Sequence, residues 1–328
     1  MLRHLLLKPD QLNRLAIVGM LPLMVVVIMV TSQTTTSAKR EPPEPPREGT
    51  LVVANLRAGS LTIHSLGGDG QSRTLALESA PHELLAIGGR IYATLPHDGA
   101  VTEIDPRAPG VLRTLAAGED AHGLSADGDT LFVTLDGANQ VIVIDHTTMR
   151  ATASYPTGDT PHSVAFASRA LYITDARDGL LRRIDLATGA STTAKAGRLP
   201  ASVAVTGSRV AVADAVTGTI TWYTLSLQPL GTLILEGEPV RILALDDNRV
   251  AISLNDSAKV AIVNLAAGKL EHTLTVAGHP DGLCLSPSGR FLAVVNNEHD
   301  SINIFRTTDW RVMVTLGTGD GPGACTWF

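Results

Sequence analysis

Three histidines recur at intervals of forty residues, and their type and spacing could support metal chemistry. They are His82, His122 and His162, and each follows a Pro or Ala at the start of a similar apolar segment. Imidazole nitrogens bind Zn, Cu and Ni, and nearby carboxylates can add a ligand or orient the rings. The candidate cofactor is therefore a divalent metal ion held by these three residues.

Duplication of one sequence unit offers another interpretation of the same histidines. Copying would repeat the imidazole every forty residues without any selection for metal binding. Neighbouring strands could also hold the rings too far apart for one ion, which needs each nitrogen at about 2 Å. We favour this repeat origin, and the metal site remains the alternative.

Other imidazoles and carboxylates should gather near the same place. Asp281 occupies the slot that the three histidines occupy elsewhere, and His279 precedes Pro280 on the opposite side of the predicted ring. The full set of candidate ligand-binding residues is His82, His122, His162, His279, Asp281, His97, His299 and Asp175. The turns add Asp98, Asp136, Asp178, Asp214, Asp256, Glu298 and Asp300. These acids could attract a cation, although Asp most often caps its own tight turn.

Catalytic residues cannot be assigned from motifs. The sequence contains no GxSxG, P-loop, HExxH or CxxCH motif, so the usual signatures of nucleophilic, phosphate-binding, zinc-protease and haem chemistry are missing.

A repeat of about forty residues positions these side chains and fills nearly the whole chain. Its most regular slot has successive starts 39 to 41 residues apart. The slot reads LVVAN from Leu51, IYATL from Ile91, LFVTL from Leu131, LYITD from Leu171, VAVAD from Val210, VAISL from Val250 and FLAVV from Phe291. Each unit holds four short apolar segments separated by turns, which predicts four antiparallel strands.

The repeat predicts an all-β, seven-bladed β-propeller of four-stranded antiparallel blades. One such sheet cannot bury both of its faces, so neighbouring sheets must stack around a ring. The repeat domain begins with the second strand of a blade at Leu51 and ends with a first strand at Phe328. The C-terminal strand should therefore pair with the N-terminal three and close the ring, which removes exposed sheet edges.

These units resemble the YVTN-type seven-bladed propeller family. LYIT from Leu171 matches the signature strand, Val141–Asp145 (VIVID) matches the next strand, and Gly158–Pro161 matches the Gly-x-x-Pro turn. The resemblance implies an extracytoplasmic binding or surface protein. In such a ring the turn after the signature strand and the Gly-x-x-Pro turn should share one face, around the mouth of the channel. The three histidines should then lie side by side on innermost strands.

The N-terminal segment predicts export. Residues 1–14 carry Arg3, Lys8 and Arg14, and the predominantly apolar segment 15–32 follows. Positive charge before an apolar run holds the N-terminus in the cytoplasm. We expect an uncleaved single-pass membrane anchor, with secretion after signal cleavage as the alternative. Residues 33–48 form a Pro-rich stalk, and residues 49–328 form the propeller.

Charge argues against a nucleic-acid partner. The whole chain has a formal charge of -6, and residues 49–328 hold 20 basic and 28 acidic residues, a net of -8. Binding to nucleic acid depends on neutralising phosphates, and no basic stretch is present in the sequence. The partner we expect is a small ligand or an envelope protein, bound by a monomer.

The two cysteines leave two arrangements open. Cys284 and Cys325 should lie on innermost strands of adjacent blades, and they could form a disulfide or remain free thiols. Two buried free thiols is the favoured prediction.

Three functions fit these observations. The leading one is a membrane-anchored, extracytoplasmic module that binds a ligand or protein at the channel mouth without doing chemistry. The first alternative is a metal-dependent lyase or lactonase-like enzyme at the same mouth. The second is an envelope scaffold subunit, which would expose apolar patches on outer strands around Trp222, Tyr223 or Trp310.

Overall fold

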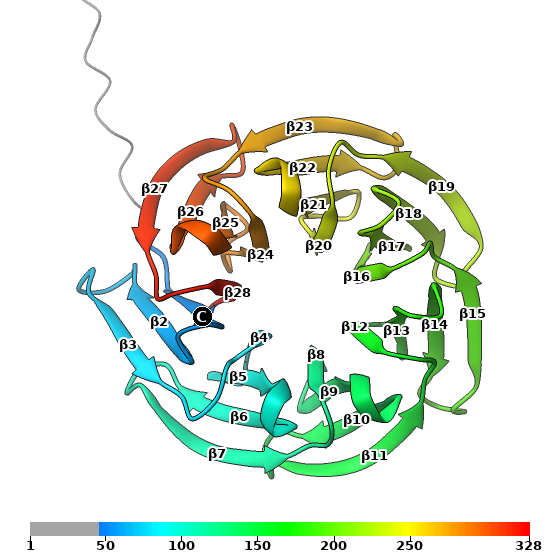
Figure 1. Ribbon diagram of the computed structural model, residues 1–328, viewed down its shortest axis with the longest axis horizontal. Coiled ribbons are helices and arrows are strands. Elements are labelled where there is room, and N and C mark those ends of the chain that lie inside the picture. Colours follow the sequence, from blue (N-terminus) through cyan, green and yellow to red (C-terminus); the bar gives the residue numbers. More distant parts are fainter. Residues whose placement is uncertain (1–45) are drawn as a thin grey trace, which may run out of the picture. The chain divides into compact units, whose positions relative to one another are not determined.

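Seven four-stranded sheets form a closed ring in the computed structural model, which describes residues 46–328 (Figure 1). We number the blades from the one that contains both ends of this region. Blade 1 is β28-β1-β2-β3, and blades 2 to 7 follow in chain order from β4 to β27. The predicted all-β fold, with seven blades of four antiparallel strands, is confirmed.

The strands fall into four concentric sets. The innermost strands are β28 (Pro322–Trp327), β4 (Leu84–Ile87), β8 (Ala121–Asp127), β12 (Pro161–Ala167), β16 (Pro200–Thr206), β20 (Pro239–Ala244) and β24 (Pro280–Leu285). The second strands are β1 (Thr50–Asn55), β5 (Arg90–Leu95), β9 (Thr130–Leu135), β13 (Ala170–Asp175), β17 (Arg209–Asp214), β21 (Arg249–Leu254) and β25 (Phe291–Asn296).

The outer two sets complete the blades. The third strands are β2 (Ser60–Ser65), β6 (Ala100–Asp105), β10 (Gln140–Asp145), β14 (Leu180–Asp185), β18 (Thr219–Thr224), β22 (Lys259–Asn264) and β26 (Ser301–Arg306). The outermost strands are β3 (Ser72–Ala76), β7 (Gly110–Ala116), β11 (Arg150–Pro156), β15 (Ser191–Lys195), β19 (Pro229–Ile234), β23 (Lys269–Thr275) and β27 (Arg311–Gly317). Four 3₁₀ turns follow second strands, namely η1 (Pro96–Asp98), η2 (Asp136–Ala138), η3 (Asn255–Ser257) and η4 (Asn297–His299).

The second strands are the core of each blade because both of their faces are buried. On β1, Leu51 and Val53 pack toward blade 7, whereas Val52 and Ala54 pack toward blade 2. A strand buried on both faces needs apolar side chains at consecutive positions, which explains why the repeated slot does not alternate. Seven apolar clusters fill the seven blade interfaces of the described region.

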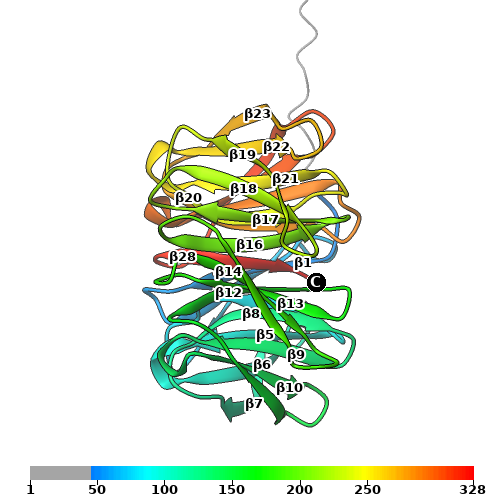
Figure 2. The same ribbon diagram turned by 90° about the vertical axis from the view of Figure 1, so that its right-hand side faces the viewer.

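The ring closes as the sequence predicts. Strand β28 pairs with β1 in antiparallel register, for example Val53 opposite Cys325. The turns gather at two opposite faces of the ring (Figure 2). The seventh repeat slot begins one residue later than predicted, at Leu292. In blade 6 the last residue of the slot, Leu254, pairs with Pro239, and the residue that pairs with the equivalent Pro280 in blade 7 is Asn296.

Cys284 and Cys325 form a disulfide, so the prediction of two free thiols is wrong. Their Cα atoms are 5.7 Å apart, and the bond links β24 of blade 7 to β28 of blade 1. Both side chains point into the interface between these blades, beside Phe291. The sequence left open whether the two side chains point toward each other or away from each other. The orientation of the two innermost strands directs both into the same interface.

The apolar patches expected for a scaffold are not at the predicted positions. Trp222 is 6% exposed and Tyr223 is 2% exposed, because both pack into blade interfaces. Trp310 is half-buried against the interface of blades 6 and 7. The exposed apolar side chains of the outermost strands include Ile234, which is 78% exposed.

The predicted anchor, residues 15–32, lies outside the described residues. Within residues 46–328, no helix has the length and apolar character needed to cross a membrane.

Candidate ligand site at the channel mouth

The turn after each second strand and the Gly-x-x-Pro turn share one face of the ring, as predicted. In blade 4 the Asp178 carboxylate, in the first kind of turn, accepts a hydrogen bond from the Asp159 amide, in the second, at 2.9 Å. In blade 6 Asp256 accepts from the Glu238 amide at 2.7 Å. We call this face the mouth face.

The three repeated histidines form a continuous arc at the mouth. His122 and His162 lie near the starts of β8 and β12, and His82 lies just before β4. The ring centroids of His82 and His122 are 3.8 Å apart, and those of His122 and His162 are 4.1 Å apart. The predicted adjacency of the imidazoles on innermost strands is therefore present in the structure.

A bulge and a threonine place each histidine. In blade 3 the pairing of β8 with β9 shifts between Ala121 and Leu124, so His122 lies in an irregular part of the strand. The Thr134 hydroxyl accepts a hydrogen bond from the Gly123 amide at 2.7 Å and donates to the His162 carbonyl at 3.4 Å. Bulges redirect side chains and are common beside functional sites.

This threonine occurs only in the units that carry the histidines. The corresponding residue of the second strand is Thr94, Thr134 and Thr174 in blades 2 to 4, and Ala213, Ser253, Val295 and Ala54 in the others. The paired occurrence of His and Thr was a signal in the sequence that could have shown a shared role.

Hydrogen bonds fix the orientation of two imidazoles. The Nδ1 atom of His122 lies 3.0 Å from the His162 carbonyl oxygen, and the Nδ1 atom of His162 lies 2.9 Å from the Ala201 carbonyl oxygen. A carbonyl oxygen only accepts, so each Nδ1 must carry the proton and each neutral ring keeps a lone pair on Nε2. Burial is the main reason that the pKa of His122 falls to about 3 and that of His162 to about 4.

His82 departs from this pattern. The carbonyl that would match its Nδ1 belongs to His122, and among the described residues that oxygen accepts from the Thr94 hydroxyl at 2.8 Å but not from His82. The Nδ1 atom of His82 is buried without a hydrogen-bond partner among the described residues. Burial, reinforced by the neighbouring His122, lowers the pKa of His82 well below its usual value.

Asp136, at the start of η2, completes a group of potential metal ligands. One ligating atom each from His122, Asp136 and His162 lie within 4.8 Å of one another. The Oδ1 atom of Asp136 is buried and has no hydrogen-bond partner in residues 46–328. Burial, with a contribution from the Asp120 carboxylate, raises the pKa of Asp136 to about 7.

The structure thus brings together a different triad from the predicted one. His122 and His162 belong to both, but Asp136 takes the third position, and the His82 ring contacts that of His122 at a tilt of 42°. Sequence reasoning placed Asp136 among the turn acids without singling it out. Two imidazoles and a carboxylate are a donor set that suits zinc and neighbouring transition metals.

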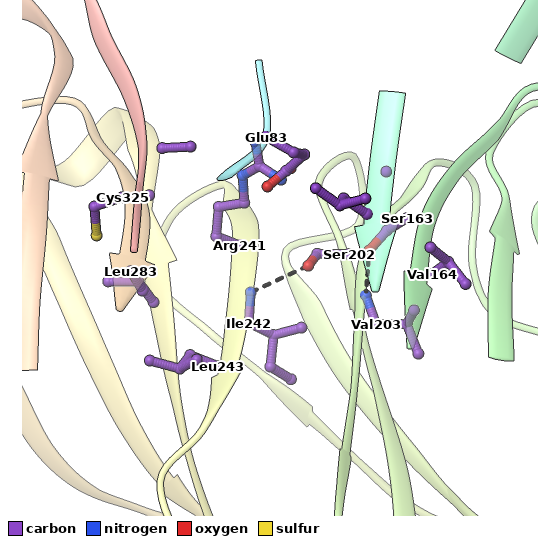
Figure 3. Close-up of a pocket in the computed structure, with 14 residues that line it drawn as sticks. Glu83, Ser163, Val164, Ser202, Val203, Arg241, Ile242, Leu243, Leu283 and Cys325 are labelled. Carbon is purple, nitrogen blue, oxygen red and sulfur yellow. Dashed lines mark hydrogen bonds and ion pairs between the residues drawn. The ribbon is translucent and has the colours of Figure 1, made fainter. Parts of the chain in front are cut away.

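A largely buried arginine spans the channel one residue further along the innermost strand than the histidine slot. Arg241 on β20 donates to the carboxylate of Glu83 on the opposite side of the ring (Figure 3). Its Nε also donates to Asp281 at 3.1 Å. Burial disfavours the charged guanidinium, but the two carboxylates raise the pKa of Arg241 overall. Burial raises the pKa of Glu83, and Arg241 partly offsets this effect.

Arg241 and Glu83 were not predicted as site residues. They occupy the slot in which the other blades carry Gly123, Ser163, Ser202, Gly282 and Ala324. The sequence did contain a signal for this pair, because one acidic and one basic residue stand in a slot that otherwise holds only small residues. Below this ion pair the channel holds a cavity of about 190 Å³, whose walls include Ser163 and Ser202 (Figure 3).

We call the part of the channel mouth between the histidine arc and the Arg241–Glu83 pair the pit. The other predicted site residues have different surroundings. Asp281 contacts Arg241, as described. His279 is near Glu298, with Nε2 to Oε1 at 3.4 Å. His97 and His299 are exposed in η1 and η4. Asp175 is buried and pairs with Arg182 at 2.8 Å, so it acts within blade 4 rather than at the mouth.

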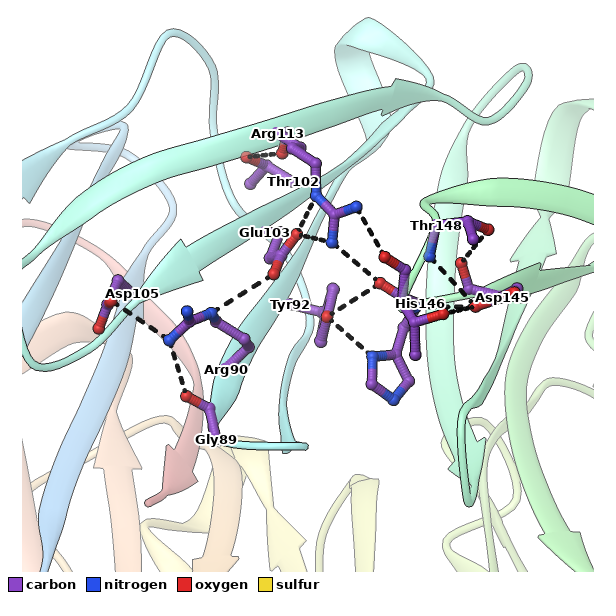
Figure 4. Close-up of polar contacts among 11 residues, drawn as sticks. Gly89, Arg90, Tyr92, Thr102, Glu103, Asp105, Arg113, Asp145, His146 and Thr148 are labelled. Atoms are coloured by element: carbon purple, nitrogen blue, oxygen red, sulfur yellow. Dashed lines mark hydrogen bonds and ion pairs between the residues drawn. The ribbon is translucent and has the colours of Figure 1, made fainter.

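A second polar cluster lies between blades 2 and 3 at the opposite face (Figure 4). The buried Glu103 carboxylate pairs with Arg90 and Arg113, and Arg113 donates to the His146 carbonyl at 3.1 Å. The Tyr92 hydroxyl contacts Nδ1 of His146 at 3.1 Å. The charged members satisfy one another, so this cluster joins the two blades.

Comparison with known proteins supports the fold and does not assign a family. No protein-family model matches this sequence, and neither does any curated protein. Among solved structures, the chain is similar to a functionally unknown protein from Desulfotomaculum acetoxidans DSM 771, with 13% identity, a TM-score of 0.71 and coverage of 85% of this chain and 98% of that one.

Two similar structures come from proteins of different kinds. Hydrazine synthase from Kuenenia stuttgartiensis has 15% identity and a TM-score of 0.65, with 74% of this chain and 88% of that one covered. U3-55K has 17% identity and a TM-score of 0.69, with 78% and 88% covered. At these identities the likeness concerns the seven-bladed propeller fold alone.

Proposed function

We propose that this protein is an extracytoplasmic, YVTN-type propeller that binds a ligand in the pit at its channel mouth. The observation that carries the proposal is a set of polar atoms around one pit that lack partners in the described chain, namely Oδ1 of Asp136 and Nδ1 of His82. Buried polar atoms are nearly always hydrogen-bonded, so such atoms beside an opening point to a bound group.

The pit has a floor. Arg241 reaches across the channel to Glu83, and both side chains are mostly buried. A ligand that enters at the mouth would therefore meet a charged, preorganised surface instead of an open tunnel. Small residues leave room on the side away from the histidines, since a side chain added at Gly323 would meet nothing closer than Asp281 at 3.8 Å.

An oxidising compartment fits the disulfide. Structural disulfides persist mainly in exported proteins, and Cys284–Cys325 closes the ring. The charge pattern of residues 1–32 favours export with a retained anchor. The chain enters the propeller at Glu48, whose carboxylate accepts from the Ser288 amide and hydroxyl. This point is at the start of β1, and the mouth is at its end, so a tether would attach on the face opposite the mouth.

A metal-dependent enzyme, such as a lyase or lactonase, is the second candidate. The observation in its favour is the group of His122, His162 and Asp136, because three protein ligands leave a coordination position open for water or substrate. The scaffold alternative has less support, because Trp222 and Tyr223 are buried.

Site-specific photo-crosslinking tests ligand capture at the mouth. A benzoylphenylalanine replaces Ala201, which lines the mouth, or Ala151, which is exposed on the outermost strand β11. After irradiation of cells that produce the full chain, mass spectrometry should find an adduct at position 201 that is missing at position 151. The variant Gly323→Met, which fills the pit, should reduce the adduct. Equal products at both positions, or none at position 201, would refute binding at the mouth.

A further inference from the structure

We propose that His122, His162 and Asp136 bind a divalent transition-metal ion at the mouth of the channel. This inference rests on the proposed function, because it names the chemical class of the group bound in the pit. The three side chains come from two adjacent blades and bring one ligating atom each to within 4.8 Å of the other two.

The two imidazoles are already prepared as ligands. Their Nδ1 atoms donate to the His162 and Ala201 carbonyls at 3.0 and 2.9 Å, which leaves the Nε2 lone pairs for a metal. Metal-bound histidines commonly show this arrangement, in which the second nitrogen donates to a carbonyl or carboxylate. Thr134 adds rigidity, because it bonds both the Gly123 amide and the His162 carbonyl.

Asp136 differs from the acids of the equivalent turns. Asp178, Asp256 and Asp300 each accept a hydrogen bond from a backbone amide of the neighbouring Gly-x-x-Pro turn. The buried Oδ1 of Asp136 accepts none within the described region. A turn-capping role therefore explains these three acids, which lie later in their turns than Asp136 does, and no such role is found for the Oδ1 atom of Asp136.

The charges around the pit favour a cation. Arg241 is the positive group of the floor, and Glu83 and Asp281 both pair with it. Asp120 lies beside Asp136 and adds further negative charge. A site lined by an excess of carboxylates raises the local concentration of cations.

The donor types limit the identity of the metal. Calcium and magnesium prefer sites made of oxygen atoms, whereas two imidazoles and a carboxylate suit zinc, cobalt, nickel or copper. Three protein ligands leave a fourth position open toward the pit. The ligand of the proposed function would then be a group that coordinates the ion at this position.

Cobalt and zinc titrations of the untagged full-length protein test the site. Co²⁺ should give the visible absorption of a four-coordinate complex at one ion per chain, and Zn²⁺ should displace it. His122→Gln, His162→Gln and Asp136→Asn should each weaken binding at least about 100-fold, because even the outer partners of metal ligands contribute 10- to 100-fold.

Matched controls lie in the next turn of the same face. His97→Gln and Asp98→Asn change the same residue types in η1 and should bind the ion like the unaltered protein. His82→Gln should also retain binding of the metal ion, which separates the proposed triad from a site made by the three repeated histidines. Asp136→Asn changes one half-buried turn residue, so it tests the site even if a histidine variant does not fold.

The outcomes separate this inference from the proposed function. No metal-dependent absorption, or equal affinity in the triad variants, would overturn the metal site. If the adduct at position 201 persisted in that case, ligand capture at the mouth would stand without a metal. If the metal bound to the triad and no adduct formed, the site would hold an ion but the proposed binding module would fail.

Discussion

Arg241 and Glu83 form an ion pair across the central channel although 158 residues separate them in the sequence. Glu83 belongs to blade 2 and Arg241 to blade 6, on opposite sides of the ring. Asp281 of blade 7 holds the same guanidinium. The pair therefore both closes the floor of the pit and ties distant blades together.

Arg241→Met should destabilise the protein by about 3–5 kcal/mol, because it leaves two largely buried carboxylates without their cation. Glu83→Gln in the same chain should recover part of this loss by removing one of these charges. Urea unfolding of the two variants gives the comparison. Arg177→Met is the control, since Arg177 is 71% exposed beside Asp159 and should cost less than about 1 kcal/mol. Equal stability of Arg241→Met and the unaltered protein would show that the pair does not form.

The disulfide should contribute about 2–4 kcal/mol to the free energy of unfolding, because it closes a long loop in the unfolded chain. Its cysteines are 41 residues apart. Cys284→Ala/Cys325→Ala should show this loss, and a reductant should lower the stability of the unaltered protein but not of the variant. Reaction of two thiols in the unfolded, unreduced protein would contradict the disulfide.

The fold was largely predictable because the repeated slot is buried on both faces. Leu51 packs against blade 7 and Val52 against blade 2, so consecutive residues of the slot must stay apolar. The slot is therefore recognisable in each repeat, and the number of its copies gives the number of blades. The start of the seventh slot was misplaced because Phe291 is as apolar as Leu292, and only the pairing of Asn296 with Pro280 distinguishes them.

The site was predictable only in part. The forty-residue spacing placed His122 beside His162, since equivalent positions of adjacent blades are neighbours in a ring. The partnership of Arg241 with Glu83 depends on the diameter of the channel, which no local pattern contains. The distinction of Asp136 from other turn acids depends on whether an amide points at its carboxylate, and this is a property of the folded turn.

Thr134 should prove to be a positioning residue for the histidine arc. Thr134→Val keeps the side-chain shape but removes the hydroxyl from the buried Gly123 amide, which should cost about 1–3 kcal/mol. Thr134→Ser keeps the hydroxyl and should retain the position of His122. Thermal unfolding measures the cost, and cobalt affinity measures the position. Weaker cobalt binding in Thr134→Val but not in Thr134→Ser would separate this role from packing, and equal binding in both would contradict it.

The metal-free protein should hold His122 and His162 as neutral rings protonated at Nδ1. Nitrogen NMR of ¹⁵N-histidine-labelled protein identifies the tautomer directly. With pKa values of about 3 and about 4 in the folded state, both rings should stay neutral at pH 6. A signal showing Nε2 protonation of either ring would contradict the hydrogen bonds to the His162 and Ala201 carbonyls.

The lowered pKa values of His122 and His162 also predict how their contribution to the free energy of unfolding depends on pH. Because these folded-state pKa values lie below the unfolded value of about 6.5, the unfolded chain binds more protons at these two residues, and their contribution to stability decreases as the pH falls from about 6.5 toward 4. Above pH 6.5 the contribution of both rings is fully present. His122→Gln/His162→Gln should flatten this part of the stability profile, and an unchanged slope would contradict the assignment.

X-ray absorption of the zinc-loaded, full-length protein tests the central claim most directly. The account predicts a four-coordinate shell of nitrogen and oxygen near 2.0–2.1 Å, with the outer-shell scattering of two imidazoles. His162→Gln should lose one imidazole from this spectrum, whereas His82→Gln should leave it unchanged. A shell without imidazole scattering, or one that loses an imidazole in His82→Gln, would contradict a site made by His122, His162 and Asp136.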